Sequence, residues 1–597
     1  MSAHPAHGMA RVSTASVAVV ALLGLAFAGA PASYAADPHL TGSVPTCEQV
    51  FARGYLPDGP PPIANGGSGV VTTVSDGAAL QAALDDAEPG DVIELASGTY
   101  TDLVAEVPEG VQGTAEENIV IRPQVPGGVV LTGASMLVLR GSHITVADLN
   151  FEDNDGVGPS DLSFAVAIGV IGSDNRVTGS TFTGNGTPEQ AWKRVVAVGG
   201  QASRTWVDSN LFVENAANGA GVTVDTDSPE GVDNYFVWNT FDRSHPDVPL
   251  YWDTAMSAGE DVAQAAKVTR TRFDYNRVVD YDGTFSLQFK TSGSFMRFNC
   301  ITGGESLLGV RLGHDNVIEG NVVTGGETGM RGGISIAGDR TVVRDNTIVV
   351  EDPPSGGSVP HLSGIYLNPG QVSADGNEQW VARDSIVENN RIAAVAPYAP
   401  LFWVPTYLDT TTALPSGNLF RDNCFTWLDD DDSSIGFFAT ERPADATPEQ
   451  LVADNTFEDN RWWTINNGAE GWVPDGLIGT NGNIWQDCTE PAQPALRPDR
   501  IVGRSSEPLS IDVLENDRFA PTAGPVIASL ALRGPAGEPV TELEVGPGRF
   551  VVDRESGTLL FERRPGARPG AATVRYLLHD TAGAERSALV VVLPARG

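Results

Sequence analysis

The stretch DGTFSLQFKTSGSFMRFNCITGGESLLGVRLGHDNVIEGN, residues Asp282–Asn321, contains the pattern that decides the fold. In its FSLQFK segment, the apolar residues Phe285, Leu287 and Phe289 alternate with polar residues. Alternation with a period of two is typical of a β-strand, because successive side chains point to opposite faces. The segment is therefore predicted to be a strand that buries its apolar residues and places Lys290 on the other face.

About one repeat later, the segment LLGVRLG alternates in the same way. Leu308, Val310 and Leu312 are predicted to face one side and Arg311 the other. If the two strands stack as successive turns of a solenoid, Lys290 and Arg311 become outward neighbours, because adjacent strands lie about 4.8 Å apart. A lysine beside an arginine on a solvated face is a candidate base and acid pair. We predict the functional site here.

Asparagines recur at a regular spacing through the middle of the chain. Asn276, Asn299, Asn321 and Asn346 are 23, 22 and 25 residues apart, with short β-type segments between them. A period of roughly two dozen residues with short β-segments is typical of a solenoid. The LxxLxL pattern of a leucine-rich repeat is missing, so we predict an all-β chain built on a right-handed parallel β-helix. Stacked asparagines at its corners would hydrogen-bond turn groups that would otherwise be buried unpaired.

Shifts in composition divide the chain into segments. CEQVFARG, from Cys47, and AALQAALDDA, from Ala78, are each expected to be a short helix, the second capping the open end of the solenoid. After Pro491, short alternating strands with frequent turn signals favour a β-sandwich, which is similar to bacterial immunoglobulin-like repeats. The predicted segments are a secretion signal at 1–35, an extended lead-in at 36–65, the β-helix at 66–490, a linker at 491–499 and the immunoglobulin-like β-sandwich at 500–597.

The first residues have the features of an export signal. Arg11 precedes an apolar run from Val17 to Ala28, and Ser33-Tyr34-Ala35 offers a cleavage site. The run is short for a membrane span, so we expect a secreted, extracellular protein. The formal net charge of −39 argues against binding to nucleic acid or to an anionic membrane. We expect a monomer that binds an anionic substrate only through a local basic patch.

The chain has four cysteines, Cys47, Cys300, Cys424 and Cys488. Export makes disulfides possible, and we prefer the pair Cys424 and Cys488 because both lie late in the same domain. No CxxC motif or Cys/His cluster suggests zinc.

Several short motifs, in this order, make the chain resemble the chondroitinase B and alginate lyase family, polysaccharide lyase family six. The similarity covers roughly residues 65–400 and includes LQAALDDAEPGDVIELASGTYTD and GTAEENIVIRPQVPGGVVLTGAS. It continues with Lys290-Thr291, R-x-G-x-x-N from Arg311 to Asn316, GGI from Gly332 and YLNPG from Tyr366. The resemblance implies β-elimination on a uronic-acid polymer, in which a base removes the proton α to the sugar carboxylate.

By motif position, the resemblance makes Lys290 the base and Arg311 the proton donor or electrostatic partner. A free lysine titrates near ~10.4, so it must be deprotonated to act near neutrality. A nearby guanidinium and partial burial both disfavour the ammonium form. The chain has only three lysines, Lys193, Lys267 and Lys290, and uses arginine almost everywhere else. A lysine used only for surface charge would more often have been an arginine.

The chain departs from the family where the resemblance places calcium ligands. The family has two glutamates just before the lysine and an asparagine upstream. Here Thr284 with Phe285 or Ser286 stand at the acidic positions. Tyr251 lies near the asparagine position, and one further carboxylate, Asp253, does not make a calcium site. We therefore predict no metal site and no other cofactor.

Without calcium, the charge that develops on the substrate needs another stabilising group. We predict that Arg311 and Gln288 hold the substrate carboxylate. The other predicted substrate-binding residues are Ser335, Tyr366, His361 and Tyr251.

Other functions stay open at this point. A β-helix glycoside hydrolase needs paired carboxylates on adjacent coils, and a pectate lyase needs a carboxylate cluster with an arginine base; no such cluster recurs in register. A non-catalytic carbohydrate-binding or adhesive β-helix would explain the missing calcium ligands, although Lys290 with Arg311 opposes it. Alginate is preferred as substrate over a glycosaminoglycan such as dermatan sulfate, whose sulfates call for extra arginines. The candidates for those are Arg331, Arg340 and Arg344.

Overall fold

The structure is a computed structural model, and its most N-terminal described residues are those of a short helix around Cys47. The described residues are 45–51, 69–224, 228–243, 254–260, 262–281, 285–304, 306–325, 332–351, 363–372, 378–395, 401–404, 410–427, 438–440, 448–464, 477–486, 499–503, 508–514, 525–534, 538–545, 548–564, 572–581 and 585–594. The predicted secretion signal and most of the predicted lead-in lie outside these residues.

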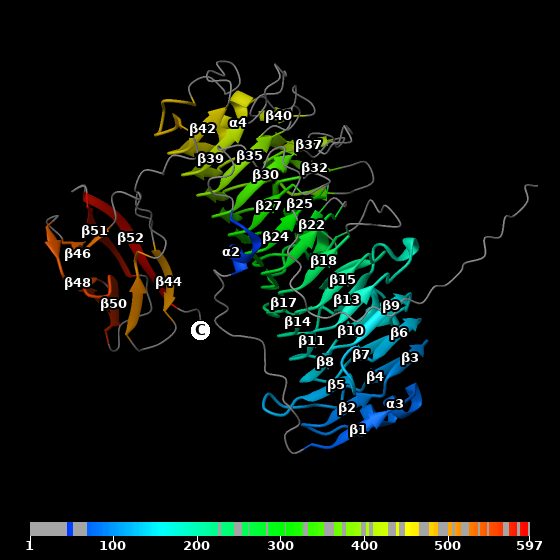
Figure 1. Cartoon of the computed structure of the whole chain (residues 1–597). Helices are drawn as coiled ribbons and strands as arrows, with labels where there is room; N and C mark the ends of the chain where they lie inside the picture. Colours follow the sequence, from blue (N-terminus) through cyan, green and yellow to red (C-terminus); the bar gives the residue numbers. More distant parts are fainter. Residues whose placement is uncertain are drawn as a thin grey trace, which may run out of the picture.

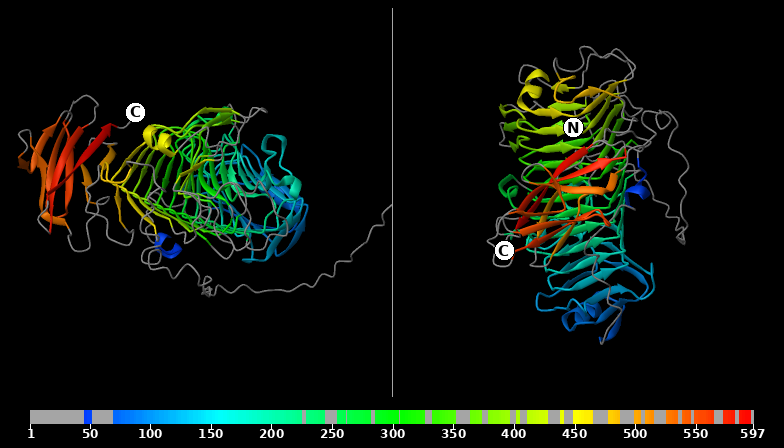
Figure 2. Two further views of the ribbon diagram at one scale, coloured as in Figure 1. Left: turned by 90° about the horizontal axis from the view of Figure 1, so that it is seen from above. Right: turned by 90° about the vertical axis from the view of Figure 1, so that its left-hand side faces the viewer.

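Between β1 (Val71–Val74) and β43 (Ile484–Trp485) the chain winds into a parallel β-helix, as predicted (Figure 1). Its strands form three sheets of 14, 12 and 14 strands, called here the first, second and third sheets. Within each sheet, neighbouring strands come from successive coils and pair in parallel. The strands stack along the whole length of the solenoid in the views of Figure 2.

The first sheet contains β1, β2 (Val92–Leu95), β5 (Ile119–Pro123), β8 (Ile144–Ala147), β11 (Arg176–Thr178), β14 (Trp206–Asp208), β17 (Tyr235–Val237), β20 (Arg272–Asp274), β23 (Phe295–Arg297), β26 (Val317–Glu319), β29 (Val342–Arg344), β34 (Ile386–Glu388), β38 (Leu419–Arg421) and β41 (Thr456–Glu458). The second sheet contains β4 (Val104–Val107), β7 (Met136–Leu139), β10 (Ala165–Val170), β13 (Arg194–Val198), β16 (Asn218–Val222), β19 (Met256–Ala258), β22 (Phe285–Lys290), β25 (Leu307–Leu312), β28 (Ile334–Ile336), β31 (Ile365–Leu367), β36 (Phe402–Val404) and β40 (Phe438–Thr440).

The third sheet contains β3 (Gly98–Thr101), β6 (Val129–Gly133), β9 (Asn150–Asn154), β12 (Thr181–Thr183), β15 (Leu211–Val213), β18 (Thr240–Asp242), β21 (Arg277–Val279), β24 (Cys300–Thr302), β27 (Val322–Thr324), β30 (Thr347–Glu351), β35 (Arg391–Val395), β39 (Cys424–Trp427), β42 (Arg461–Thr464) and β43. A small side sheet joins β32 (Gly370–Val372), β33 (Glu378–Gln379) and β37 (Thr410–Ala413). The short helical elements are α2 (Cys47–Phe51), α3 (Gly77–Asp85), α4 (Pro448–Asp454), η1 (Ser160–Leu162), η2 (Pro188–Gln190) and η3 (Val262–Gln264).

Ladders of like side chains fill the interior of the solenoid. Phe151, Phe182, Phe212 and Phe241 come from successive coils of the third sheet and are fully buried. Their rings stack with centroids 5.3, 4.8 and 4.6 Å apart. These four coils therefore contribute the same kind of side chain at the same place, so that a shift of one of them against the next would break several contacts at once.

A ladder of buried asparagines runs along the corner between the first and third sheets, as the sequence predicts. Asn299 Oδ1 accepts hydrogen bonds from the main-chain N and from Nδ2 of Asn276, at 2.9 and 3.0 Å. Asn299 Nδ2 donates to Phe273 O at 2.7 Å and to Asn321 Oδ1 at 2.9 Å. The ladder continues through Asn210, Asn239, Asn346, Asn390, Asn423, Asn460 and Asn483.

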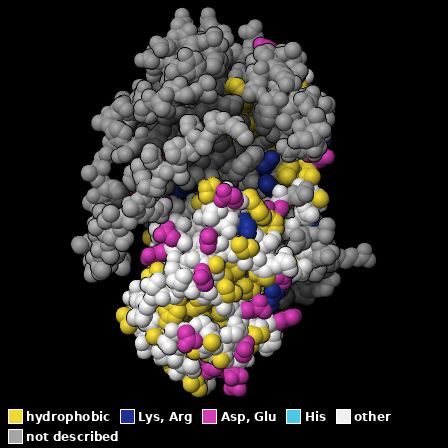
Figure 3. Space-filling model, turned by 90° about the vertical axis from the view of Figure 1, so that its right-hand side faces the viewer, with side chains coloured by type: hydrophobic (Ala, Val, Ile, Leu, Met, Phe, Trp, Pro, Cys, Tyr) yellow, Lys and Arg dark blue, Asp and Glu magenta, His cyan; other side chains and the backbone are white. Residues whose placement is uncertain are grey.

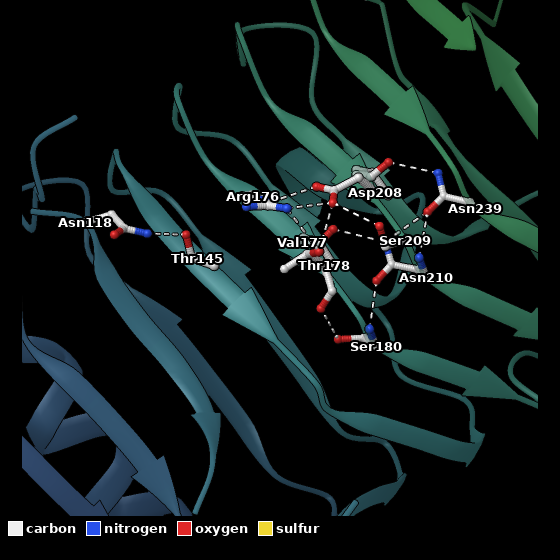
Figure 4. A network of polar contacts seen from close by, with 11 residues as sticks. Asn118, Thr145, Arg176, Val177, Thr178, Ser180, Asp208, Ser209, Asn210 and Asn239 are labelled. Carbon is white, nitrogen blue, oxygen red and sulfur yellow. Dashed lines mark hydrogen bonds and ion pairs between the residues drawn. The ribbon is translucent and has the colours of Figure 1, made fainter. Parts of the chain in front are cut away.

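The backbone explains why asparagine is needed at this corner. The residue before a ladder asparagine has a left-handed conformation, with φ of 59° at Tyr275, 55° at Phe298 and 66° at Gly320. This sharp turn leaves peptide groups pointing along the solenoid, and an amide side chain both donates to and accepts from them. Figure 4 shows Asn210 and Asn239 in this arrangement, next to the ion pair of Arg176 and Asp208.

Three arginines, Arg297, Arg344 and Arg421, belong to a row of alternating charge on the first sheet. Register pairs Asp274 with Arg297, Arg297 with Glu319, and Glu319 with Arg344. Arg344 forms an ion pair with Glu319 at 2.9 Å, and Arg297 with Asp274 at 2.5 Å. Burial raises the pKa of the Asp274 carboxyl, against the opposing effect of Arg297. The row continues through Glu388, Arg421 and Glu458.

The helix α3 covers the N-terminal end of the solenoid, as predicted. Asp76 caps it by accepting a hydrogen bond from Ala79 N at 2.8 Å. Leu80 and Leu84 on its inner face are fully buried. The helix therefore covers part of the apolar interior at this end of the solenoid.

The short helix α2, predicted in CEQVFARG, is joined to β24 by a disulfide between Cys47 and Cys300. In Figure 1 it lies beside the middle coils. Cys424 is also disulfide-bonded. The preferred partner of Cys424, Cys488, lies outside the described residues, so that pairing stays a prediction.

The C-terminal strands form a separate unit of two sheets with its own core. The first contains β44 (Asp499–Gly503), β52 (Glu585–Pro594), β51 (Ala572–Asp580), β46 (Pro525–Arg533) and β47 (Pro539–Val540), and the second β45 (Leu509–Asp512), β50 (Thr558–Arg563), β49 (Gly548–Asp553) and β48 (Glu542–Val545). Buried residues from both sheets share one apolar cluster, so the unit is the predicted β-sandwich. All its strand pairs are antiparallel except that of β44 with β52.

The surface reflects the acidic composition. In the lower part of Figure 3, which the first coils form, acidic side chains are scattered among apolar and uncharged ones, and few basic side chains are visible. Among the described helices, none is long and apolar enough to cross a membrane.

We predict that Asn299→Ala lowers the free energy of unfolding by about 3 kcal/mol or more, because it leaves several buried peptide and amide groups unpaired. Asn299→Asp, which keeps the acceptor but loses the donor, should also destabilise. The exposed Glu152 of β9 provides the control, since Glu152→Ala should change stability by less than about 0.5 kcal/mol. Denaturant unfolding measures all three, and equal values for Asn299→Ala and Glu152→Ala would show that the ladder does not carry the fold.

Candidate functional site

A row of residues on the outer face of the second sheet brings several predicted site residues together. Register pairs Ser257 with Gln288, Gln288 with Gly309, Gly309 with Ser335, and Ser335 with Tyr366. Their neighbours Leu287, Phe289, Leu308 and Val310 belong to the interior core. Gln288, Ser335 and Tyr366 therefore lie on one cross-strand line, although up to 78 residues of sequence separate them.

Lys290 and Arg311 lie two residues beyond this row, on the adjacent strands β22 and β25. Alternation places both on the same face as the row, as the sequence predicts. A bulge interrupts the pairing here, because Phe289 pairs with Val310 whereas Lys290 pairs with Leu312. Arg311 is the extra residue of the bulge. Bulges re-aim side chains and are common beside functional sites.

The bulged register also corrects part of the predicted strand. Leu287 and Phe289 are in the interior as expected, but Phe285 packs in a small cluster with Leu307, Tyr366 and Trp403. A second irregularity, between Phe285 and Leu287, turns Phe285 to the other face. Leu312 is buried without joining the interior core cluster. The two-residue period of the sequence was therefore correct for the middle of each strand and for Lys290, and wrong at Phe285 and Leu312.

Lys290 is partly buried, and its ammonium group has a defined partner. Lys290 Nζ donates a hydrogen bond to the main-chain O of Glu260 at 3.1 Å. Glu260 follows β19, the strand of the preceding coil. The carboxylate of Glu260 forms an ion pair with Arg194 of β13. Lys290 is thus connected through Glu260 to the coil of β19 and, through the ion pair of Glu260, to the coil of β13.

Arg311 is partly buried and stands apart from the other arginines of the solenoid. Arg176, Arg297, Arg344 and Arg421 each form an ion pair with an acidic residue. No hydrogen bond or ion pair to Arg311 is found within the described ranges. A partly buried guanidinium without a counter-ion favours the binding of an anion.

The motif residues beside the pair hold its backbone. Asn316 Nδ2 donates to Thr291 O at 3.0 Å, and Ser294 N donates to Asn316 Oδ1 at 2.9 Å. A Cβ on Gly313 would lie 2.1 Å from Thr291 O, and φ at Gly313 is +111°. Only glycine allows this approach. Thr291, Gly313 and Asn316 therefore fix the corner of the solenoid. This corner directly follows the strand ends that carry Lys290 and Arg311.

The predicted substrate-binding residues differ in their exposure. Gln288 is 7% exposed, and its amide makes no hydrogen bond within the part of the chain that the structure describes. Ser335 is fully buried; its hydroxyl donates to Val310 O and accepts from Asn368 Nδ2, both at 2.9 Å. Ser335 therefore belongs to the frame of the site and not to its open surface. Tyr366 is 3% exposed and packs against Phe285 and Leu307.

Two further predicted residues, His361 and Tyr251, lie outside the described residues. Their roles stay predictions.

The described residues do not fit the calcium site that the family resemblance implies. Phe285 is packed in an apolar cluster, and Ser286 Oγ donates to Leu307 O at 3.2 Å. Within the described ranges, no group of three His, Cys, Asp or Glu residues could hold a metal ion. Calcium prefers six to eight oxygen ligands. We therefore derive no step through a metal.

Sequence reasoning missed Arg194, Ser257 and Glu260. Arg194 lies 96 residues before Lys290 in the sequence and reaches the site only because three coils stack. Ser257 shares the cross-strand row with Gln288. The one available signal was the repeat register itself, which would have aligned Ser257 with Gln288.

The fold and this site define a parallel β-helix protein with a lysine and an arginine on the outer face of one sheet. The family model described as Chondroitinase B matches residues 74–407, which is more than half of the chain. The chain therefore belongs to the chondroitinase B family. No curated protein matches it in sequence.

The solved structures that are similar to the chain include three polysaccharide lyases of family 6. A mutant of the PL6 family alginate lyase AlyGC matches with a TM-score of 0.51 and 20% identity, over 70% of this chain and 53% of AlyGC. A PL6 alginate lyase in complex with a trisaccharide matches with a TM-score of 0.52 and 20% identity, over 70% of this chain and 88% of that lyase. A mannuronic acid specific polysaccharide family 6 lyase from human gut microbiota matches with a TM-score of 0.51 and 18% identity, over 68% of this chain and 92% of that lyase. The chain spans about half the length of AlyGC. At these identities the similarity shows the fold.

We predict that Gly313→Ala destabilises the protein by several kcal/mol, because its Cβ would overlap Thr291 O. Gly127→Ala is the matched control, since φ at Gly127 is +72° and a Cβ there would meet no atom within 4 Å. That change should cost only about 1–2 kcal/mol, the intrinsic cost of the left-handed backbone. Thermal or denaturant unfolding compares the two variants, and an equal loss in both would contradict the assigned role of the corner.

Proposed function

We propose that the protein is a secreted polysaccharide lyase that cleaves a uronic-acid polymer by β-elimination. The observation that carries the proposal is the placement of Lys290 and Arg311 on one face of adjacent strands, with Arg311 lacking a counter-ion within the described ranges. Membership of the chondroitinase B family supports it. So do the three lyases of similar fold.

In the proposed reaction, neutral Lys290 takes the proton from the carbon α to the uronate carboxylate. The electron pair of that C–H bond forms the carbon–carbon double bond, and the bond to the glycosidic oxygen breaks. The departing oxygen receives a proton from Arg311 or from water, and Lys290 returns its own proton to the solvent, so that the products are a shortened chain and a chain ending in an unsaturated uronate. Atoms and charge balance without any oxidant or reductant, because β-elimination is a redox-neutral cleavage.

Charge stabilisation is assigned to Arg311 and Gln288. Removing the α-proton places negative charge on the carboxylate, and donors aimed at that charge are typically the largest contribution to catalysis. A guanidinium offers two parallel N–H groups to a carboxylate. Gln288 lies in the adjacent row, on the strand that carries Lys290. The proposal therefore uses no calcium.

The described arginines favour alginate over a sulfated glycosaminoglycan. Arg344 is paired with Glu319 on the first sheet, away from Lys290. Arg340 is paired with Asp315 through two hydrogen bonds of 2.7 and 2.8 Å. Arg331 lies outside the described residues. Since the two described candidates for sulfate binding are already engaged by carboxylates, we propose an unsulfated polyuronate, alginate, as the substrate.

Secretion and monomeric state are part of the same proposal and rest on the N-terminal sequence and the acidic charge. The C-terminal sandwich is proposed to be an immunoglobulin-like spacer or attachment module.

A non-catalytic carbohydrate-binding β-helix is the second candidate. One observation favours it, because Thr291, Gly313 and Asn316 hold the corner of the solenoid. A protein that had lost catalysis would still need them. Lys290 and Arg311 separate the two candidates, since the contacts described for this corner involve neither side chain.

We predict that Lys290→Met abolishes lyase activity, at least ~1000-fold, because no other group would accept the α-proton. Lys267→Met is the matched control. Lys267 Nζ also donates to a main-chain oxygen, that of Ser228, at 2.6 Å. The two variants should lose similar stability, and only the first should lose activity. The assay is the ultraviolet absorbance of the unsaturated uronate on a panel of uronic-acid polymers.

If wild-type protein, shown to be folded, gives no such product from any polymer but still binds one, the binding module becomes the better assignment.

We predict that chelation leaves the activity unchanged, within about twofold, because the proposed charge stabilisation uses Arg311 and Gln288 and no metal. The measurement is the same absorbance assay with and without EDTA. Loss of activity with EDTA and its return with calcium would refute the metal-independent reaction while leaving the lyase assignment intact.

A further inference from the structure

A buried arginine crosses the outer face of the second sheet toward Lys290. Arg194 is 2% exposed, and its Nη2 and Nε donate to Ser257 Oγ at 2.8 and 3.2 Å. Its guanidinium lies over the ring of Phe164, 5.9 Å from the centroid. A Cβ on Gly221 would lie 2.6 Å from Arg194 Nε, so glycine is required where the side chain passes. The structure therefore holds this guanidinium in one place.

Glu260 connects this arginine to the lysine through two different groups. Its carboxylate forms an ion pair with Arg194 Nη2, whereas its main-chain O accepts the hydrogen bond from Lys290 Nζ at 3.1 Å. The side chain of Glu260 is 28% exposed, so burial alone does not fix its direction. Without Arg194, the carboxylate of Glu260 would be free to turn toward the Lys290 ammonium, because the main-chain oxygen of the same residue already accepts a hydrogen bond from it.

We propose that Arg194 is a positioning residue that holds the Glu260 carboxylate away from Lys290 and so keeps this lysine easier to deprotonate. The inference rests on the proposed function in taking Lys290 as the base. An adjacent carboxylate stabilises an ammonium ion and raises its pKa, and an adjacent cation does the reverse. By pairing with Arg194, Glu260 offers Lys290 only a neutral carbonyl oxygen. A base that must act near neutral pH benefits from this arrangement.

Two other titratable side chains follow Lys290 on the next coil. Within the described ranges, Arg311 lies on the following coil and disfavours the ammonium form. His314 lies past the corner that follows β25, where its Nδ1 accepts from Asp339 N at 2.9 Å and its ring stacks on Trp380. Neither provides a negative charge. Glu260 is therefore the described carboxylate whose direction decides the charge that Lys290 meets.

The test measures the pKa of Lys290 directly. Because the chain has three lysines, reductive methylation with a ¹³C label gives few NMR signals, which Lys193→Arg and Lys267→Arg assign. We expect Arg194→Met to raise the pKa of Lys290 by about one unit and Glu260→Gln to lower it by about one unit. The double variant, which removes the whole ion pair, should return it close to the wild-type value. Arg194→Lys keeps the charge and should shift it least.

These opposite shifts separate an electrostatic role from a purely structural one. Unfolding or loosening of the sheet would move both single variants in the same direction, toward the value of a free lysine, and that result would overturn the proposal. If Arg194→Met does not fold, Glu260→Gln and Arg194→Lys still decide it, since no shift in Glu260→Gln contradicts the account.

Lyase activity gives the second readout. The acid limb of the pH profile of kcat/KM should move up by about one pH unit in Arg194→Met and down by about one in Glu260→Gln. Opposite NMR shifts in a protein without lyase activity on any polymer would refute the proposed function and support the role of Arg194. Lyase activity with unchanged pKa values in both single variants would refute the role of Arg194 and leave the proposed function standing.

Discussion

The asparagine ladder at the corner between the first and third sheets is the interaction on which the rest of the structure depends. Each left-handed turn, such as those at Tyr275 and Phe298, would leave buried peptide groups without partners, at a cost of about 1–3 kcal/mol each. The amides of Asn276, Asn299 and Asn321 satisfy these groups and connect one coil to the next. Because the ladder fixes the register between coils, it also fixes which residues meet on the far side of each coil.

The proposed site is a product of that register. Lys290 and Arg311 belong to different coils and become neighbours only because β22 pairs with β25. A bulge in this pairing makes Arg311 an extra residue without a register partner on β22. Gly313 and Asn316 then hold the following corner against Thr291. The site thus consists of ordinary repeat positions occupied by unusual residues, on a scaffold where other arginines are paired with acids. Chemistry of this kind can be lost by changing two side chains while the fold persists.

The sequence was sufficient for the repeat, the parallel β-helix, the capping helix α3 and the facing of Lys290 and Arg311, because these follow from local periodic patterns of apolar residues and from the spacing of about two dozen residues. It was insufficient where the backbone leaves the regular period. The irregularities around Phe285 and Arg311 reversed the expected face of Phe285. Ser335 has the expected direction but its hydroxyl is taken up by Val310 and Asn368. Arg194 and Glu260 could not be found, since no local pattern records a side chain that reaches across coils.

The proposed function requires that the Lys290 and Arg311 pair performs an elimination on a uronic-acid polymer. The most direct test is the mass of the products released from purified polyuronates by the full-length protein. Elimination predicts that every oligosaccharide with a newly formed non-reducing end is one water lighter than the hydrolysis product and carries a double bond in that terminal uronate. If the new non-reducing ends were saturated and of full mass, the claim would be contradicted, because water would have to attack the glycosidic bond, for which the described outer face of β22 and β25 provides no pair of carboxylates.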